Sequence, residues 1–394
     1  MPSTRRATLA SLGAATAALA GCTTLEDLLR DPPDRRVTPD WSPAPGTWPE
    51  SGYGPANTRY NPHATPPREP PTAAWTEFTR GNVTSLVVGD RRVYAGTDEE
   101  VVALDPADGT RMWTREADGT SELAYTDGRL YERDTERVRA RSADGEKQWE
   151  TSVPELPLDV HEQDGYVLLP TGGGSLTLHA DTGEVVRDRD GEMGRIAVRP
   201  DGLYGADYGT VGRYRLRNRG LANRWTSDIP GPYQAYAPPV VVGDVLYQSE
   251  RALSGSDAPG GRLSMYGVDD GARQGGQPFD HVPFGVAVGE NRVFVGTATI
   301  TAGDLGVAGR FVALDRNGSR RWEYRVGGGI APPAVGGDVV VAGPYAKSTT
   351  PVTALNADSG RTLWERTVPG SAELVAVEDT VYVGAAGSVT ALRP

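Results

Sequence analysis

The sequence contains very little cysteine, lysine or histidine, and these shortages exclude several ways of building and using a protein. A single cysteine, Cys22, among 394 residues excludes an intramolecular disulfide. The four histidines share no spacing typical of metal ligands. Lysine occurs only at Lys147 and Lys347, so arginine supplies nearly all of the positive charge. The fold must therefore be held by its apolar core and by hydrogen-bonded strands.

Basic residues are also fewer than acidic residues, and the formal net charge is −12. An acidic, lysine-poor chain does not favour nucleic acid as a partner. This composition resembles that of proteins from halophilic archaea, in which high salt screens the repulsion between like charges. A GC-rich genome would favour the same residues, so the composition has two explanations.

The apolar run at residues 7–21 is too short to span a bilayer but suits the core of a signal peptide. Arg5 and Arg6 precede it, and this pair resembles a twin-arginine export signal. Leu19-Ala20-Gly21-Cys22 is similar to a lipoprotein box, in which the cysteine thiol receives the lipid. We predict a signal peptide over residues 1–21, and an anchor at Cys22 on the outer face of the cytoplasmic membrane. A free thiol in an ordinary signal peptide is the alternative interpretation of Cys22.

Residues 22–47 show no apolar periodicity and contain several prolines, which predicts an extended tether. From residue 48 to the end, short runs of β-branched and aromatic residues alternate with Asp-Gly, Asn-Gly and Thr-Gly pairs. Such runs are typical of strands, and such pairs are typical of tight hairpins. Four strands recur about every 40 residues, which is typical of the blades of a β-propeller. A propeller domain is therefore predicted over residues 48–394.

Tryptophans mark the ends of the repeats. They occur at Trp75, Trp113, Trp149, Trp225, Trp322 and Trp364. Seven intervals separate Trp75 from Trp364, and three further strands follow Trp364. The strand around Trp75 would supply the fourth. We therefore predict an all-β, eight-bladed propeller of four-stranded antiparallel blades, with the last blade closed by the N-terminal strand.

The repeat at residues 103–113 is similar to the PQQ-type repeat, Ala-x-Asp-x-x-x-Gly-x-x-x-Trp. Residues 52–62 resemble the lead-in that precedes such propellers in halophilic archaeal members. Over residues 48–394 the chain resembles the eight-bladed propeller lipoproteins of the outer-membrane β-barrel assembly machinery. The resemblance implies that each tryptophan packs between neighbouring blades. It also implies a monomer that binds other exported or membrane proteins and contacts the membrane only through its lipid.

The PQQ-type repeat is named after a quinone cofactor, so we also considered a quinone-dependent enzyme. Quinoprotein alcohol dehydrogenases resemble the repeat pattern, but many carry a disulfide of adjacent cysteines, and this chain has no second cysteine. No segment matches their Ca²⁺ ligands, and there is no Gly-x-Ser-x-Gly motif. We therefore predict no catalytic, cofactor-binding or metal-binding residues. A PQQ-dependent dehydrogenase and a surface receptor for a small solute such as a sugar are the alternative functions.

Three consecutive repeats carry long connections between their second and third strands. These are residues 248–261, 297–309 and 344–351. Loops on a rigid scaffold often carry binding function, although surface insertions also cost little stability. We predict a raised binding rim that includes Tyr345 and Lys347. The predicted function is that of a non-enzymatic, membrane-anchored scaffold or binding module outside the cytoplasm.

Overall fold

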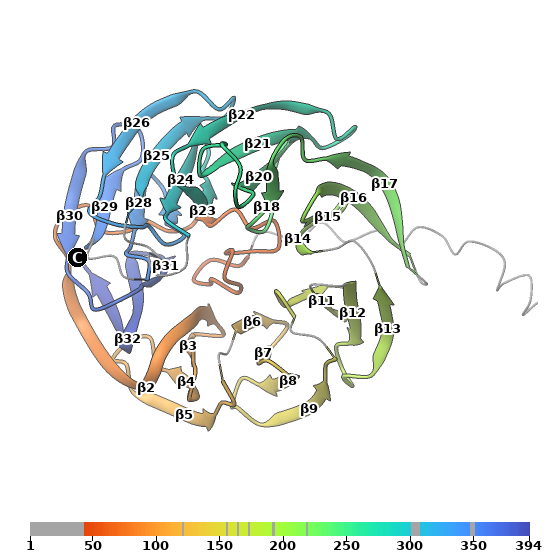
Figure 1. The fold of residues 1–394 in the computed structure, drawn as a ribbon. Coiled ribbons are helices and arrows are strands. Elements are labelled where there is room, and N and C mark those ends of the chain that lie inside the picture. The colour runs from red at the N-terminus through yellow and green to blue at the C-terminus, as the bar shows by residue number, and fades with distance from the viewer. Residues whose placement is uncertain are drawn as a thin grey trace, which may run out of the picture.

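Seven β-sheets are arranged as a ring around a central axis, as Figure 1 shows. The computed structural model describes residues 43–119, 122–154, 157–163, 165–171, 174–190, 194–217, 220–300, 308–346 and 351–394. Each sheet extends outward from an innermost strand near the axis. The prediction of an all-β propeller with antiparallel blades is confirmed. The predicted signal peptide at residues 1–21 with Arg5 and Arg6, the predicted lipid site Cys22, residues 22–42 of the predicted tether, and Lys347 lie outside the described residues.

Four sheets hold four strands each in simple sequence order, and three of these four follow one another directly along the chain. One contains β6 (Glu122–Thr126), β7 (Arg129–Arg133), β8 (Arg137–Ser142) and β9 (Lys147–Ser152). The next contains β10 (His161–Gln163), β11 (Tyr166–Pro170), β12 (Gly174–His179) and β13 (Val185–Asp190). The third contains β14 (Arg195–Arg199), β15 (Gly202–Asp207), β16 (Thr210–Arg217) and β17 (Gly220–Asp228).

Three further sheets complete the second half of the ring. In one, β18 (Tyr233–Ala235) and β19 (Val240–Val242) both pair with β20 (Val245–Ala252), followed by β21 (Gly261–Gly267) and β22 (Arg273–Phe279). Another holds β23 (Val282–Val288), β24 (Arg292–Ala298), β25 (Arg310–Asp315) and β26 (Arg320–Arg325). The last holds β1 (Tyr60–Asn61), β27 (Ala334–Gly336), β28 (Val339–Ala342), β29 (Val352–Asn356) and β30 (Thr362–Arg366). In that sheet β1 pairs in parallel with β27.

The remaining sheet joins the two ends of the chain and has six strands. Their order is β31 (Glu373–Val377), β32 (Thr380–Arg393), β2 (Thr72–Gly89), β3 (Arg92–Thr97), β4 (Glu100–Leu104) and β5 (Arg111–Glu116). The first part of β2 pairs with β32, beginning at Thr72 opposite Arg393. The second part of β2 pairs with β3. One long strand thus ties the C-terminal strands to those of the first repeat.

The prediction of eight blades is wrong, because the described residues form seven sheets. The predicted first and last blades are parts of the single six-stranded sheet. Both β2 and β32 continue across the points at which the repeat pattern placed a new strand. The spacing of a sequence motif gives the number of repeats. The number of sheets depends instead on which strands are hydrogen-bonded to one another.

The repeat tryptophans join each unit to the next in the same way. The indole Nε1–H of each of these six tryptophans donates a hydrogen bond of 2.7–3.0 Å to a backbone carbonyl between strands. From Trp75 to Trp364, the acceptors are Pro106, Ala143, Ala180, Val268, Ala357 and Pro67. A buried donor must find such a partner, so the six bonds fix the geometry between units.

In five units, the glycine of the turn before the last strand lies against one of these rings. Gly145, for example, has a φ of 81°, and a Cβ there would come within 2.7 Å of the Trp113 indole. Glycine is therefore required at this position for two reasons: the backbone is left-handed, and the ring leaves no room for a side chain. In one of the two repeats whose last strand lacks a tryptophan, Met265 takes the place of the ring, because a Cβ at Gly318 would come within 2.8 Å of the Met265 Cε.

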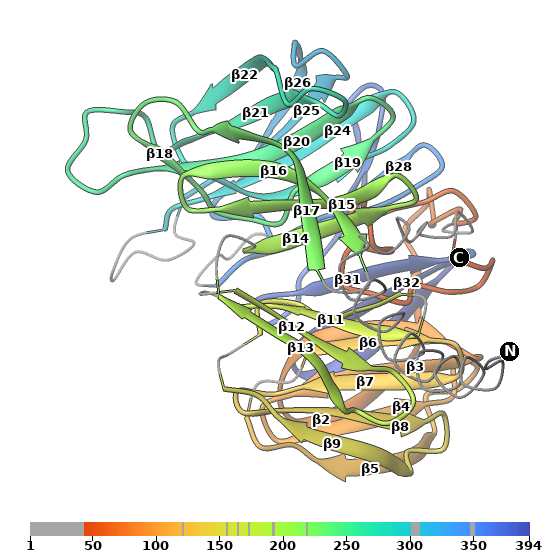
Figure 2. The same cartoon turned by 90° about the vertical axis from the view of Figure 1, so that its right-hand side faces the viewer.

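Residues 48–66, which we call the lead-in segment, lie across one face of the ring. Figure 2 shows this red-orange segment on the right-hand face, whereas the loop between β20 and β21 projects from the opposite face. Trp364 donates its hydrogen bond to Pro67, just after this segment, so the N-terminal part of the chain completes the last of the inter-unit contacts. No helix in the described ranges is long and apolar enough to cross a membrane.

Candidate functional site at the open end of the central channel

One end of the central channel is closed by the lead-in segment. Trp48 forms a bridge with Val88, with two hydrogen bonds of 2.8 Å. Further innermost strands donate backbone hydrogen bonds to lead-in carbonyls: Tyr125 to Pro49, Val198 to Pro55, Val241 to Ala56, Val288 to Thr58, and Val335 to Arg59. These bonds satisfy backbone groups at the ends of strands that would otherwise be buried without partners.

Two buried polar side chains strengthen this closure. The Asn57 amide donates to the backbone carbonyls of Ile196 and Pro239, at 2.8 and 3.1 Å. The guanidinium of Arg59 donates through Nε to the Pro333 carbonyl at 2.7 Å, and it also contacts the Ser51 carbonyl. Burial lowers the pKa of Arg59. These bonds run from the lead-in segment to three different sheets and hold it in the centre of the ring.

The sheet of β10–β13 is held to the lead-in segment by a buried charge cluster. His161 Nδ1 lies 3.0 Å from Glu50 Oε2, and its Nε2 lies 3.2 Å from Asp159 Oδ2. Burial alone would lower the pKa of His161, but Asp159 and Glu50 outweigh it and raise the pKa well above its ordinary value. With this contact the lead-in segment touches all seven sheets.

Beyond the lead-in segment the channel widens into a cavity of about 300 Å³. Charged side chains from the first residues of innermost strands line it: Glu122 of β6, Arg195 of β14 and Glu373 of β31. Burial raises the pKa of Glu373 to about 7, although Arg59 opposes the shift. Burial, with the field of Asp159, also raises the pKa of Glu122. The cavity thus holds two carboxyl groups whose pKa values lie above the ordinary value for glutamate, because burial disfavours the charged form.

Three half-buried aromatic side chains stand at the mouth of this cavity. The ring centroids of Phe284 and Tyr345 are 4.2 Å apart, and those of Phe284 and Tyr236 are 6.1 Å apart. The guanidinium of Arg251 lies over the Tyr236 ring at 5.4 Å. The three rings come from loops or strand starts of three neighbouring sheets. They form an aromatic cluster that we call the mouth cluster.

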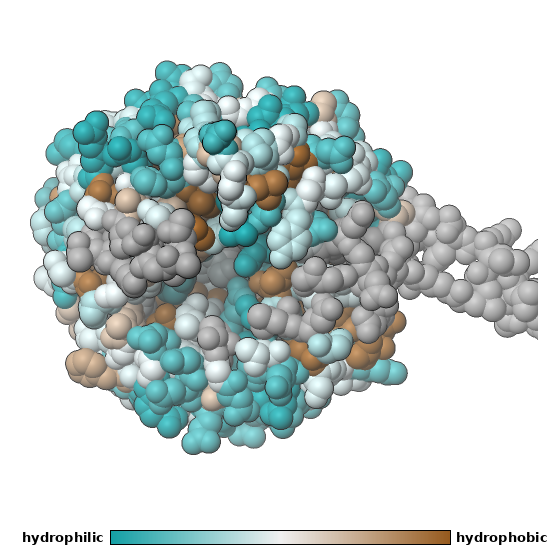
Figure 3. All heavy atoms as spheres, in the orientation of Figure 1, coloured by the Kyte–Doolittle hydropathy of each residue, from teal (hydrophilic) through white to brown (hydrophobic). Residues whose placement is uncertain are grey.

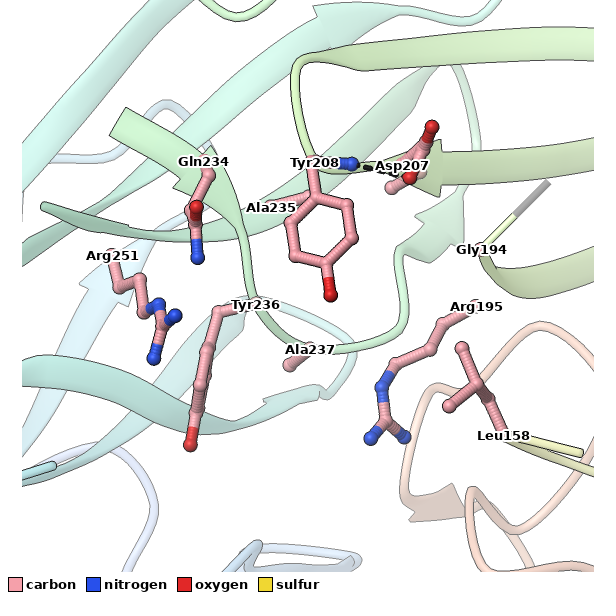
Figure 4. A pocket seen from close by; sticks show the side chains of 11 residues that line it. Leu158, Gly194, Arg195, Asp207, Tyr208, Gln234, Ala235, Tyr236, Ala237 and Arg251 are labelled. Atoms are coloured by element: carbon pink, nitrogen blue, oxygen red, sulfur yellow. Dashed lines mark hydrogen bonds between the residues drawn. The ribbon is translucent and has the colours of Figure 1, made fainter. Parts of the chain in front are cut away.

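A smaller cavity of about 220 Å³ adjoins the first and shares Arg195 and Tyr236 with it. Figure 4 shows the Arg195 guanidinium on one side and Tyr236 with Arg251 on the other, with the Tyr208 ring between them. Tyr208 is 66% exposed, so this cavity opens to solvent. Figure 3 shows this face of the ring hollowed at its centre, with hydrophilic and hydrophobic atoms on the walls.

The described parts of the three long connections leave their sheets on the same face, since each connection joins the second strand to the third strand of its sheet. Tyr345 of the third connection belongs to the mouth cluster. Lys347 and residues 301–307 lie outside the described ranges. Leu253 of the first connection is 43% exposed. Tyr345 was singled out from the sequence, and its role in binding stays a prediction. Tyr236, Phe284 and Arg195 carried no signal that distinguished them from ordinary strand residues.

Comparison with known proteins agrees with this architecture. The family model described as "Outer membrane protein assembly factor BamB" matches residues 72–252 and 259–394. The chain belongs to this BamB family. No curated protein sequence matches it. A solved BamB structure, from Moraxella catarrhalis, is 15% identical with a TM-score of 0.64, and the alignment covers 82% of this chain and 100% of that one.

Two dehydrogenases share the BamB-like fold. Quinohemoprotein alcohol dehydrogenase from Comamonas testosteroni is 13% identical, with a TM-score of 0.69, over 88% of this chain and 80% of that one. A europium-containing methanol dehydrogenase is 12% identical, with a TM-score of 0.68, over 90% of this chain and 99% of that one. At such identities the likeness concerns the fold alone.

A metal-dependent centre requires several ligating side chains that lie close together. Among them, no group of three or more His, Cys, Asp or Glu side chains is placed to hold a metal ion. Asp159, His161 and Glu50 come close to one another, but their ion pairs already use the facing atoms. The described part of this BamB-family chain therefore does not fit a metal site of the kind that the name of the europium-containing enzyme implies.

Proposed function

We propose that this protein is a non-enzymatic scaffold that binds other exported or membrane proteins at the open end of its channel. The observation that carries the proposal is the difference between the two ends. One end is closed by a hydrogen-bonded segment, whereas the other presents the mouth cluster beside exposed Tyr208 and Leu253. Aromatic residues and arginine are enriched in the centres of protein interfaces. Membership of a family described as an assembly factor supports the same role.

Partner capture from solubilised membranes tests the proposal. The double variant Tyr236→Ala, Phe284→Ser removes two of the three rings of the mouth cluster and should reduce capture at least tenfold, since about 1.4 kcal/mol gives this factor. Phe78→Ser is the matched control, because Phe78 is an exposed aromatic on the β2 strand, away from the channel. Equal capture by the double variant and the control would contradict the proposal.

The anchor is part of the same proposal. We propose that Arg5 and Arg6 direct export and that Cys22 carries the lipid, so that the propeller is held outside the cytoplasmic membrane. Cys22→Ser should leave the precursor uncleaved or release the protein into the medium. Replacing both arginines with lysine should block export separately. If the Cys22→Ser protein fractionates with membranes as the parent does, the lipid anchor is excluded.

A quinone-dependent dehydrogenase is the second candidate, favoured by the structural likeness to two dehydrogenases. Pyrroloquinoline quinone and Ca²⁺ added to the purified protein would test it through binding and dye-linked oxidation of alcohols or sugars. Catalytic oxidation of an alcohol or a sugar by the protein would contradict the scaffold proposal and support the dehydrogenase. A thermal-shift screen with sugars tests the third candidate, a receptor for small solutes.

A further inference from the structure

The cavity beside the channel mouth contains a cation whose donors are unused. Arg195 makes no hydrogen bond or ion pair within the part of the chain that the structure describes. Its guanidinium points into the space between Leu158, Tyr208 and Tyr236. A guanidinium carries five N–H donors in a planar fork, which matches the two oxygens of a carboxylate. An arginine of this kind is therefore available to an anionic ligand.

Asp159 and Glu122, the two acids whose charge Arg195 influences, do not use this fork. Asp159 Oδ2 pairs with His161 at 3.2 Å, and its Oδ1 accepts a hydrogen bond from the Val160 backbone at 2.9 Å. Glu122 pairs with Arg133. Both acids still act on Arg195 through space, since Arg195 favours the charged form of each. Their fields help to hold the arginine in place, while its donors stay free for a ligand.

The opposite wall supplies a flat apolar surface. Tyr236 presents its ring to the cavity, and Arg251 is held behind it. With the Gln234 amide turned so that its oxygen faces the guanidinium, Arg251 donates to it through Nε and Nη2 at 2.6 and 2.7 Å. Because Arg251 is occupied in this way, Arg195 is the main anchor for an anion. Tyr208 adds an exposed aromatic ring between the two walls.

Size and charge narrow the class of ligand. The cavity volume of about 220 Å³ equals that of about seven water molecules, which suits a group of amino-acid size. Asp207 also lines the cavity, and its carboxylate disfavours a ligand with two negative charges. A single carboxylate attached to an aromatic or apolar body satisfies the fork, the flat wall and the charge.

We propose that this cavity binds the carboxylate of a small aromatic or apolar group, either at the C-terminus of a polypeptide or in a free acid. The carboxylate lies in the fork of Arg195, and the apolar body lies between the Tyr208 and Tyr236 rings. The inference rests on the proposed function, because it gives the binding face of the scaffold a ligand chemistry.

Calorimetric titration tests the inference with three probes, namely the tripeptide Gly-Gly-Tyr, its C-terminal amide, and 4-hydroxyphenylacetate. The free-acid peptide should bind at least tenfold more tightly than the amide, because charge-assisted hydrogen bonds to arginine are lost with the charge. Peptide binding tighter than that of 4-hydroxyphenylacetate indicates a polypeptide C-terminus. The reverse order indicates a free acid.

Arg195→Gln should weaken binding of the free-acid peptide at least tenfold, and Arg195→Lys should restore part of it. Arg325→Gln is the control, because the Arg325 side chain is 84% exposed outside the cavity. Thermal unfolding of each variant confirms that it is folded. The inference is overturned if acid and amide bind alike, if no carboxylate binds at millimolar concentration, or if Arg195→Gln binds as the parent does. Capture of protein partners through the mouth cluster is measured separately, so failure here leaves that result standing.

Discussion

The two ends of the central channel are built from the same innermost strands, yet they differ in almost every other respect. At the closed end Trp48 is fully buried, and backbone hydrogen bonds tie the lead-in segment to the surrounding sheets. At the open end Tyr236, Phe284 and Tyr345 are half-buried, and the Phe284 ring lies next to each of the other two. The difference indicates that stability is concentrated at one end of the channel and that the other end is free to bind.

Removal of the N-terminal strand should have the largest effect. A chain that begins at residue 79 lacks the lead-in segment and the part of β2 that pairs with β32. It exposes a strand edge and leaves Trp364 without its acceptor at Pro67. We expect aggregation or loss of cooperative folding, because the total stability of a folded protein is typically only about 5–15 kcal/mol. Thermal unfolding with light scattering measures it.

The control for this experiment is a chain that begins at residue 43, which keeps both the lead-in segment and β2. It should unfold at the temperature of the full chain. A chain of residues 79–394 that unfolds at the same temperature would show that the closed end does not stabilise the ring.

A single substitution in the lead-in segment should have the next largest effect. Trp48→Ala removes a fully buried indole that packs 5.1 Å from the Tyr53 ring and 5.9 Å from the Arg59 guanidinium. A loss of about 3–5 kcal/mol in the free energy of unfolding is expected for such a cavity. Urea denaturation at constant salt gives the value. An equal loss from Tyr236→Ala would contradict the contrast between the two ends.

The pH dependence of stability should report on Glu373, which lies between the ends. Its pKa is raised from 4.5 to about 7, so the folded protein keeps a proton that the unfolded chain has released. Stability therefore falls as pH rises from about 4.5 to about 7, and the loss is complete above this range. Glu373→Gln removes the titrating group and therefore this loss of stability. The variant should be more stable than the parent above about pH 8, by up to about 3 kcal/mol.

Below the ordinary pKa of a glutamate the two proteins should have similar stabilities, because Glu373 is then protonated in both states. Denaturation curves across this range provide the measurement. Glu116→Gln serves as the control, since Glu116 is an exposed acid on β5. A constant difference between parent and Glu373→Gln at every pH would rule out the shifted carboxyl as its cause.

The smallest effect on stability should come from the open end. Tyr345→Ser removes a half-exposed ring that contacts Phe284, at an expected cost below about 1 kcal/mol. Partner capture should nevertheless fall, because an aromatic ring at the centre of an interface contributes strongly to binding. The two measurements are made on the same sample. A variant that loses several kcal/mol but captures partners normally would reverse the proposed roles of the two ends.

The sequence predicted the repeated parts of the fold well, because their chemistry is local. Gly109 and Gly145 have φ values of 77° and 81°, as expected for Asp-Gly turns, and the tryptophans that follow join neighbouring units. The same spacing predicted eight blades and was wrong, since β2 and β32 join two repeats into one six-stranded sheet. Pairing between distant strands depends on backbone continuity, which a motif count does not contain.

The candidate site was predicted only in part. Tyr345 was found because it lies in an inserted loop, and insertions are visible in a repeat sequence. Arg195, Tyr236 and Phe284 occur in or near ordinary strand patterns, so nothing local set them apart. Their importance arises because separate sheets bring them to one cavity.

The sequence by itself determined that this chain forms antiparallel strands joined by tight glycine turns, because each of these features depends on residues close together in the chain. The regular spacing of the tryptophans marked the repeats. The tertiary structure alone decided that the lead-in segment closes one end of the channel and that Arg195 and the mouth cluster meet at the other. These arrangements bring together residues more than a hundred positions apart, such as Asn57 and Ile196. Only closure of the ring sets the distances between such residues, and no local pattern encodes them.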